Sequence, residues 1–263
     1  MATNFACVDI AKAAEMENTE QVESGRTNYS FDEIEDYDNI HYTYEEDGKT
    51  YSVYESVNDT MTESSTEVYV LNGDEEVLVE EYTTRMETIA GALYMCKYEN
   101  GVLVDQRFVD TVAEEEHSNA MFARAVYNGK VYYEGSTRRY FTGWYYAYQD
   151  IGSTEVAKLS LSAVVLIVGK IMGIEDKKDY EKQGVYDVAE KIIELAIPDI
   201  YWKKDVYEVS QIRYPEKTYY GSWVGMKVLS KIYADKGRTN LIKSKQYELR
   251  TSEWPSTITV GKA

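Results

Sequence analysis

Several residue types are scarce in this sequence of 263 residues, and each scarcity excludes a class of protein. The chain holds only two cysteines and three prolines, which excludes a disulfide-dense scaffold, a collagen-like chain and a proline-rich linker. Basic residues number 28 against 46 acidic ones, which gives a net charge of -18. This balance excludes a general nucleic-acid binder, because such a protein needs an excess of Lys and Arg against phosphate.

Long apolar runs are also lacking. No stretch reaches the roughly 20 apolar residues that a membrane helix needs. The longest uncharged and mostly apolar stretch covers residues 159–169, between Lys158 and Lys170, which is a length typical of a buried core helix. We therefore expect no permanent transmembrane segment. The first residues show neither the basic nor the apolar region of a signal peptide. The protein is thus either cytosolic or a mature form with its leader not present, and the acidic, Tyr-rich composition favours a secreted protein.

Catalytic and metal-binding motifs are missing as well. His41 and His117 are the only histidines and do not form the two-histidine zinc pattern. No nucleophile elbow, phosphate-binding glycine loop or dinucleotide fingerprint is present. We therefore predict no catalytic, cofactor-binding or metal-binding residues. Cys7 and Cys96 can pair only if the fold brings their α-carbons within about 7 Å, and the sequence leaves this open.

The charge that is present is unevenly distributed. Residues 1–130 hold 29 acidic and 8 basic side chains, a net charge of -21. Residues 131–263 hold 17 acidic and 20 basic side chains, a net charge of +3. One interpretation is intramolecular complementarity with solubility. The other is that the basic end meets an anionic surface, such as a bacterial envelope or anionic lipid.

Tyrosine is abundant, with 26 copies, and many of them alternate along predicted hairpin strands. Four turn pairs favour hairpins because both central residues need positive φ: Asp47-Gly48, Asn72-Gly73, Asn100-Gly101 and Asn128-Gly129. A two-residue turn at the first pair puts Tyr44 opposite Tyr51. It also puts Tyr42 opposite Val53, on the same face. The regular spacing predicts a meander of about eight antiparallel strands.

After residue 150 the pattern becomes helical and then returns to strands. Ser153-Thr154-Glu155 predicts a helix start, followed by an apolar helix over residues 156–172. An apolar stripe from Val185 to Ala196 predicts a second helix, which Pro198 ends. Three further strands are predicted over residues 202–214, 218–234 and 241–249.

These elements predict an α+β fold that is mostly antiparallel β. Residues 1–37 form an acidic N-terminal segment that we expect to be irregular, and residues 38–150 form an acidic β-hairpin domain. Residues 151–198 form a central helical pair. Residues 199–263 form a basic C-terminal β segment with a three-stranded antiparallel sheet.

One aromatic cluster stands directly before the apolar helix. Amphipathic aromatics followed by an apolar segment are typical of membrane-interface anchoring, although the same residues can pack a helix against a sheet. The candidate membrane or partner contacts are Tyr140, Phe141, Trp144, Tyr145, Tyr146, Tyr148, Val164, Leu166 and Ile167.

The order of these features over residues 40–263 resembles that of the geobacillin-26-like large bacteriocins secreted by Gram-positive bacteria. The resemblance rests on the Tyr- and Thr-rich hairpins, the Trp144-Tyr145-Tyr146 step, the Ala/Val/Ile helix, and a closing β segment with Tyr219-Tyr220 and Trp223. It implies a secreted, heat-sensitive antibacterial toxin. It implies no catalytic residues.

Three functions therefore compete. The first is a secreted, bacteriocin-like antimicrobial protein that acts without catalysis at the envelope of target bacteria. The second is a secreted or surface-displayed β-rich binding or assembly module, whose strand edges pair with other copies in self-association. The third is a carboxylate-dependent hydrolase, which needs two carboxylates with split pKa values in a cleft.

Overall fold

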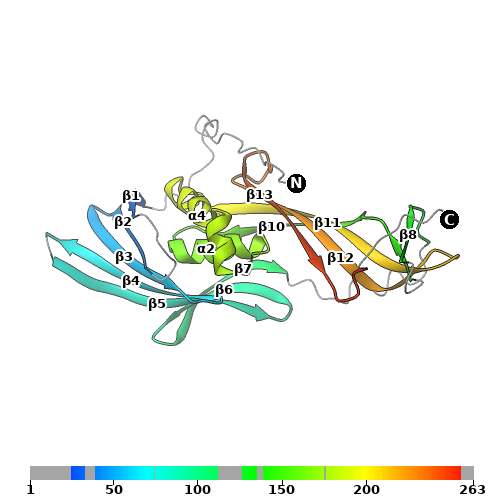
Figure 1. Cartoon of the computed structure of the whole chain (residues 1–263). Coiled ribbons are helices and arrows are strands. Elements are labelled where there is room, and N and C mark those ends of the chain that lie inside the picture. The colour runs from blue at the N-terminus through cyan, green and yellow to red at the C-terminus, as the bar shows by residue number, and fades with distance from the viewer. Residues whose placement is uncertain are drawn as a thin grey trace.

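The structure of the protein is a computed structural model. It describes residues 25–32, 39–73, 75–111, 126–134, 139–174 and 176–255. The chain is mostly antiparallel β, arranged in two sheets with helices between them (Figure 1). Cys96 is buried with a free thiol, and the open question of its pairing with Cys7 lies outside the described residues.

The first sheet has seven strands that follow one another in chain order, each antiparallel to the next. The strands are β1 (Arg26–Phe31), β2 (Ile40–Glu46), β3 (Lys49–Val57), β4 (Glu63–Asn72), β5 (Glu75–Ile89), β6 (Ala92–Glu99) and β7 (Val102–Thr111).

The hairpin of β2 and β3 has the register predicted from its turn. Tyr44 faces Tyr51, and Tyr42 faces Val53. Asp47 and Gly48 have φ values of 52° and 71°, the positive values that the type I′ turn requires. Three side chains of these two pairs are buried and the fourth, that of Tyr51, is half-buried, so the tyrosines on this face pack into the core.

Two expectations about the first half of the chain are wrong. The N-terminal segment of residues 1–37 contains β1, which pairs with β2 although its polar sequence shows little alternation. The Asn128-Gly129 hairpin does not form. Val126 instead makes a bridge to Thr218, and Tyr127 N–H donates to the carbonyl of Lys217. The backbone of residues 126–127 thus pairs with residues 217–218, which are distant in sequence, and not with the segment after Gly129.

The second sheet has six strands, and the three C-terminal strands form only part of it. Its order is β13-β12-β11-β9-β8, and β10 also pairs with β11. β9 and β10 follow the same edge of β11 one after the other. The strands are β8 (Val131–Glu134), β9 (Arg139–Thr142), β10 (Tyr145–Glu155), β11 (Asp199–Arg213), β12 (Thr218–Tyr233) and β13 (Leu241–Arg250).

Three helices are present in the described part of the chain: α2 (Leu161–Ile171), α3 (Lys177–Lys182) and α4 (Val185–Glu194). The helix start predicted at Ser153-Thr154-Glu155 is wrong, because these residues end β10, where Thr154 pairs with Ile200. Ser160 is the N-cap of α2 instead, and its hydroxyl accepts from Ala163 N–H at 3.4 Å. Leu161 follows it directly at the helix start.

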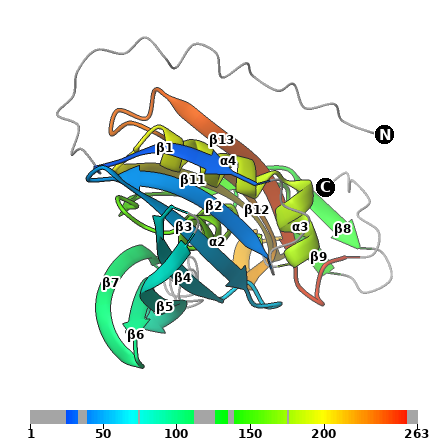
Figure 2. The same ribbon diagram turned by 90° about the vertical axis from the view of Figure 1, so that its left-hand side faces the viewer.

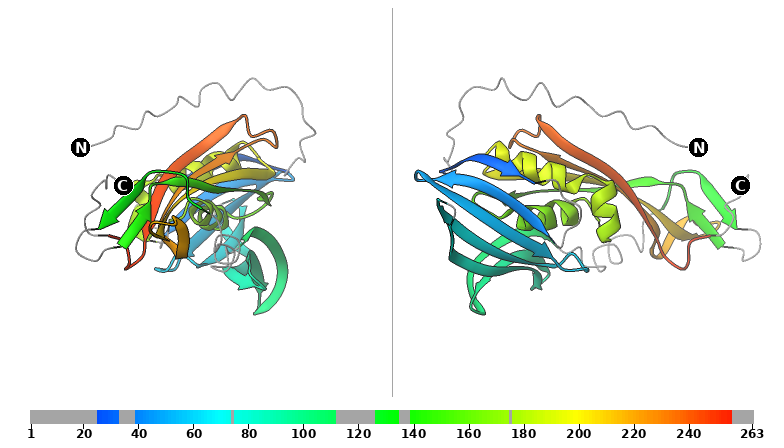
Figure 3. Two further views of the ribbon diagram at one scale, coloured as in Figure 1. Left: turned by 90° about the vertical axis from the view of Figure 1, so that its right-hand side faces the viewer. Right: turned by 60° about the vertical axis from the view of Figure 1, so that its left-hand side comes forward.

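α2 lies between the two sheets and joins their cores (Figures 1 and 2). Ten of its eleven residues are buried. One apolar cluster runs from Ile40 in the first sheet through α2 to Ile232 in the second. The predicted boundary between residues 150 and 151 falls inside β10, which pairs with β11 along its whole length. The second sheet extends beyond the helices and ends in β8 and β9 (Figure 3).

Candidate functional site

The predicted aromatic cluster is divided between the two faces of the second sheet. A bulge interrupts the pairing of β10 with β11 between Tyr146 and Tyr148, so Tyr146 faces Tyr207 whereas Tyr148 faces Val206. Neighbouring residues of a strand point to opposite faces. Tyr146 and Tyr148 therefore lie on opposite faces, although residues two apart share a face in an unbroken strand. Both remain exposed.

The far end of the cluster is used for packing. Phe141 is fully buried in a small core with Val209 and Val224. Tyr140 stacks on Tyr214, with ring centroids 4.6 Å apart. These contacts hold β9 against β11 and leave Phe141 unable to touch a partner. For this part of the cluster, the aromatic rings pack within the sheet and do not form a membrane or partner contact.

Tyr145 also makes its contacts within the second sheet. Its hydroxyl donates to the Glu208 carboxylate at 3.0 Å and lies 3.0 Å from the Ser210 hydroxyl. Burial raises the pKa of Glu208, and burial raises the pKa of Tyr145 as well. The phenol therefore stays protonated and bonds the carboxylate across the β10–β11 pair.

An outward-facing row of side chains crosses the four strands beside Tyr146. Tyr146 pairs with Tyr207, which pairs with Lys227, which in turn pairs with Glu248. The rings of Tyr146 and Tyr207 meet edge to face with centroids 5.6 Å apart. Tyr146 is 53% exposed. The row thus presents an aromatic pair and a cation to solvent on one face.

Two tryptophans extend this row. The rings of Trp144 and Trp254 lie 5.8 Å apart, and Gly225 leaves the space in which Trp254 packs on the sheet. Lys227 Nζ lies 4.5 Å from the ring centre of Trp144, and the Arg250 guanidinium lies 4.6 Å from that of Trp254. Each cation therefore covers a tryptophan ring face.

We call the six residues that present these groups the aromatic-cationic face. They are Trp144, Tyr146, Tyr207, Lys227, Arg250 and Trp254.

Basic side chains outnumber acidic ones in the part of this face around Lys227 and Lys203. Lys227 and Arg250 share one carboxylate, that of Glu248, at 3.4 and 3.1 Å. Further along the same face Lys203 pairs with Lys231 across the strands, and Asp205 lies 3.5 Å from Lys203. These four cations against two carboxylates give this part of the face a locally positive potential, whereas Glu155 and Asp199 lie at its far end.

Sequence reasoning found Trp144 and Tyr146 but missed the other four members. Tyr207, Lys227, Arg250 and Trp254 lie at least 60 positions further along the chain and carry no local motif. The signal that could have pointed to them is the basic excess of the last quarter. Their meeting depends on strand pairing between β10, β11, β12 and β13.

The helix residues of the predicted contact set are buried. Val164, Leu166 and Ile167 are all fully buried in α2. In this structure they belong to the apolar core that α2 shares with both sheets. None of the helices in the described ranges is long and apolar enough to cross a membrane.

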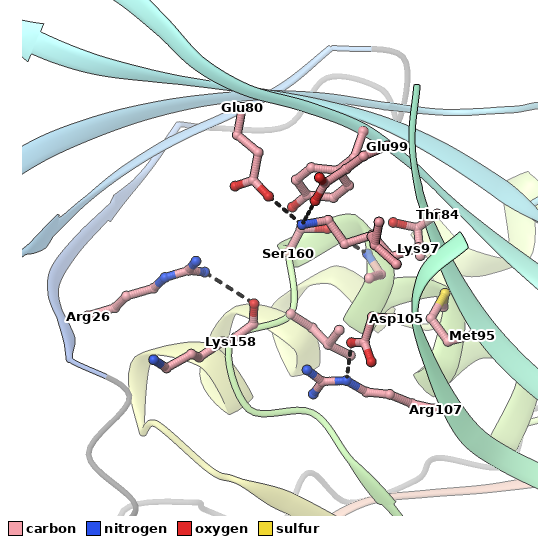
Figure 4. A pocket seen from close by; sticks show the side chains of 14 residues that line it. Arg26, Glu80, Thr84, Met95, Lys97, Glu99, Asp105, Arg107, Lys158 and Ser160 are labelled. Carbon is pink, nitrogen blue, oxygen red and sulfur yellow. Dashed lines mark hydrogen bonds and ion pairs between the residues drawn. The ribbon is translucent and has the colours of Figure 1, made fainter. Parts of the chain in front are cut away.

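A pocket of about 310 Å³ lies between the first sheet and the start of α2 (Figure 4). Lys97 forms ion pairs with Glu80 and with Glu99, the latter at 3.2 Å. Arg107 binds Asp105 at 2.8 Å. Arg26 and Lys158 also line the pocket, so its lining holds four basic and three acidic side chains, and Arg26 pairs with Glu46 at 3.4 Å. Most of its charged groups are thus already paired, and the pair of Lys97 with Glu80 links β5 to β6.

The few metal-ligating and nucleophilic side chains hold structural positions where the structure describes them. His41 lies 2.7 Å from Asp32 and 2.9 Å from the Ser52 hydroxyl. Burial raises the pKa of the Cys96 thiol, which keeps it protonated. Within the described residues no three His, Cys, Asp or Glu side chains gather as metal ligands. His117 lies outside them.

Comparison with known proteins found no relative of this chain. No family model matches the chain, and neither a curated protein nor a solved structure matches it.

Proposed function

We propose that this protein binds the anionic envelope of bacteria through its aromatic-cationic face, as the attachment step of a secreted, non-catalytic antibacterial protein. The observation that supports the proposal is the exposure of Trp144 and Tyr146 beside Lys227 and Arg250. Amphipathic rings suit a boundary between polar and apolar groups, and cations beside them attract anionic phosphate. Both requirements meet on one face of the second sheet.

The charge distribution supports a preferred orientation. The described residues of the first sheet and its turns (25–32, 39–73 and 75–111) hold 16 acidic and 5 basic side chains, a net charge of -11. The six strands of the second sheet hold 7 acidic and 9 basic side chains, a net charge of +2, and the two sheets lie toward opposite ends of the molecule (Figure 1). An anionic surface therefore repels the first sheet and attracts the second. In this proposal the hairpin meander and the central helical pair are a rigid support that keeps the C-terminal strands facing the envelope.

A binding experiment with purified bacterial cell walls and anionic lipid vesicles tests the proposal. The double variant Trp144→Ala/Lys227→Ala removes one ring and the cation on it. We expect its apparent Kd for the envelope material to rise by about tenfold, because burial of one ring at the surface and the attraction of one cation to anionic groups together contribute about 1–2 kcal/mol. Loss of killing of Gram-positive cells should accompany it.

The matched control is Tyr54→Ala, which removes an exposed aromatic ring from the first sheet. This variant should bind and kill as the unchanged protein does. Equal losses in both variants, or no binding by the folded unchanged protein to either material, would contradict the proposal. Binding to vesicles alone would assign the anionic surface to lipid, and binding to cell walls alone would assign it to the wall polymer.

A further inference from the structure

The first half of β5 is an unpaired strand edge. β4 pairs with β5 from Glu75 to Arg85, whereas β6 pairs with it only from Thr83 to Ile89. Among the strands that the structure describes, the backbone of residues 75–82 therefore has a neighbour on one side only. We call this stretch the β5 edge. Its free N–H and C=O groups can receive another strand.

Three consecutive apolar side chains on the β5 edge are exposed to solvent. Val77, Leu78 and Val79 are 40%, 47% and 53% exposed. Leu78 faces Tyr69 and Glu80 faces Val68, so Val79 is the extra residue of a bulge. Three consecutive exposed apolar residues on an open edge form a surface that proteins normally cover or interrupt with charge.

Negative charge flanks the apolar run at both ends. Glu75 and Glu76 precede it, and Glu80 and Glu81 follow it; Glu80 is ion-paired with Lys97, so the other three glutamates carry the unbalanced charge. A second copy that paired antiparallel about Leu78 would place Glu76 opposite Glu80 and Glu75 opposite Glu81. Like charges directly opposite one another destabilise a strand pair. The edge therefore opposes self-pairing and favours a strand of the opposite charge.

We propose that the β5 edge binds an extended peptide segment with an apolar centre and Lys or Arg at both ends, which adds to the first sheet as a further strand. Main-chain hydrogen bonds supply the affinity in this mode of recognition, and the flanking glutamates supply the preference for basic ends. The proposal is independent of the aromatic-cationic face, which lies on the other sheet.

Two synthetic peptides test it, measured by fluorescence anisotropy with the full chain. The first is Lys-Lys-Val-Thr-Val-Thr-Lys-Lys, and the second replaces its four lysines by glutamate. We expect the lysine peptide to bind about tenfold more tightly, because the end pairs change from attraction to repulsion. Backbone amides of residues 75–82 should become protected from hydrogen exchange when it binds.

Charge reversal makes the test sharper. Glu75→Lys/Glu76→Lys/Glu81→Lys changes three exposed flanking residues, takes the charge of the four flanking positions from -4 to +2, and should reverse the order of the two peptides. Leu78→Asp should abolish binding of both, whereas Leu195→Asp, a matched exposed leucine at the end of α4, should leave binding unchanged. Circular dichroism confirms that each variant is folded.

Several outcomes overturn the proposal. The first is an unchanged peptide preference in the charge-reversed variant, and the second is protection that appears at residues 102–107 of β7 instead of residues 75–82. The third is a dimer in light scattering that dissociates when Leu78→Asp is introduced, because a second copy then occupies the edge. Reversed preference with protection of residues 75–82 supports the proposal.

Discussion

Glu55 is a buried carboxylate that binds the first turn of α2, and its replacement tests how this central helix is held. Ser162 N–H donates to one carboxylate oxygen at 2.7 Å, and the Thr66 hydroxyl donates to the other at 3.1 Å. The residue is only 4% exposed. Burial raises the pKa of Glu55, although the hydrogen bonds from Ser162 and Thr66 partly oppose this change.

Removal of the carboxylate should cost much more than its neutralisation. Glu55→Ala leaves the Ser162 and Thr66 donors without this partner, and an unsatisfied buried group costs about 1–3 kcal/mol. We therefore expect Glu55→Ala to lower the free energy of unfolding by about 2–6 kcal/mol. Glu55→Gln keeps an oxygen that can accept from Ser162, so we expect it to cost less than half as much.

The pH dependence has a definite sign. Because the folded-state pKa of Glu55 is raised, the protonated carboxyl is favoured in the folded protein. Its contribution is fully present below the unfolded pKa of about 4.3 and is lost as pH rises through the folded pKa. The stability of the unchanged protein relative to Glu55→Gln should therefore fall as pH rises above about 4.3, at up to about 1.4 kcal/mol per pH unit.

Urea unfolding followed by tryptophan fluorescence at several values from about pH 4 to about pH 7 measures both effects. Glu81→Gln, an exposed glutamate on β5, is the control and should change stability by less than about 0.5 kcal/mol. Equal destabilisation by Glu55→Ala and Glu55→Gln would refute the role of the carboxylate oxygens. Parallel pH profiles for the unchanged protein and Glu55→Gln would refute the pKa argument.

Three further predictions address the core, a close contact and a turn. Ile167→Ala should lower the free energy of unfolding by about 2–5 kcal/mol because its side chain is fully buried, while the exposed control Leu195→Ala should cost less than about 1 kcal/mol; equal costs in urea unfolding would contradict this. Gly152→Ala should cost about 1–3 kcal/mol, since the new Cβ would lie 2.1 Å from the buried Trp202 ring, and an unchanged melting temperature would contradict it. Hydrogen bonds from backbone amides lower the pKa of Asp235, despite the opposing effect of burial, so its contribution to stability should be lost as pH falls through the folded pKa; Asp235→Asn should flatten that part of the pH profile, and identical acid profiles would contradict the assignment.

The hairpins were predictable where turn chemistry and alternation agree. The Asp47-Gly48 turn fixes the register of β2 and β3, and the local backbone then places Tyr44 opposite Tyr51. The same reasoning failed at Asn128-Gly129 because Tyr127 bonds Lys217, which is distant in sequence. It also missed the β5–β6 turn, where Ala90 takes a positive φ of 50° before Gly91 in place of the usual Asn or Asp.

The sequence likewise predicted one helix better than the other. The apolar stripe of α4 identifies it from sequence, because its period places all buried residues on one side. α2 is apolar on nearly all sides, so its sequence gives no face and no clear start. A tertiary contact marks its start. Ser160 is the N-cap, and Glu55 on β3 of the first sheet accepts a hydrogen bond from the Ser162 amide in the first turn.

By itself the sequence determined the strands with strong alternation, the turns at Asp47-Gly48 and Asn100-Gly101, and the unequal division of charge, since each depends on neighbouring residues only. Tertiary structure alone decided which side chains share a surface. Trp144, Tyr146, Lys227 and Arg250 meet because hydrogen bonds join strands that are far apart in sequence. A single bulge turns Tyr148 to the opposite face. The proposed site is thus set by strand register, which no local pattern encodes.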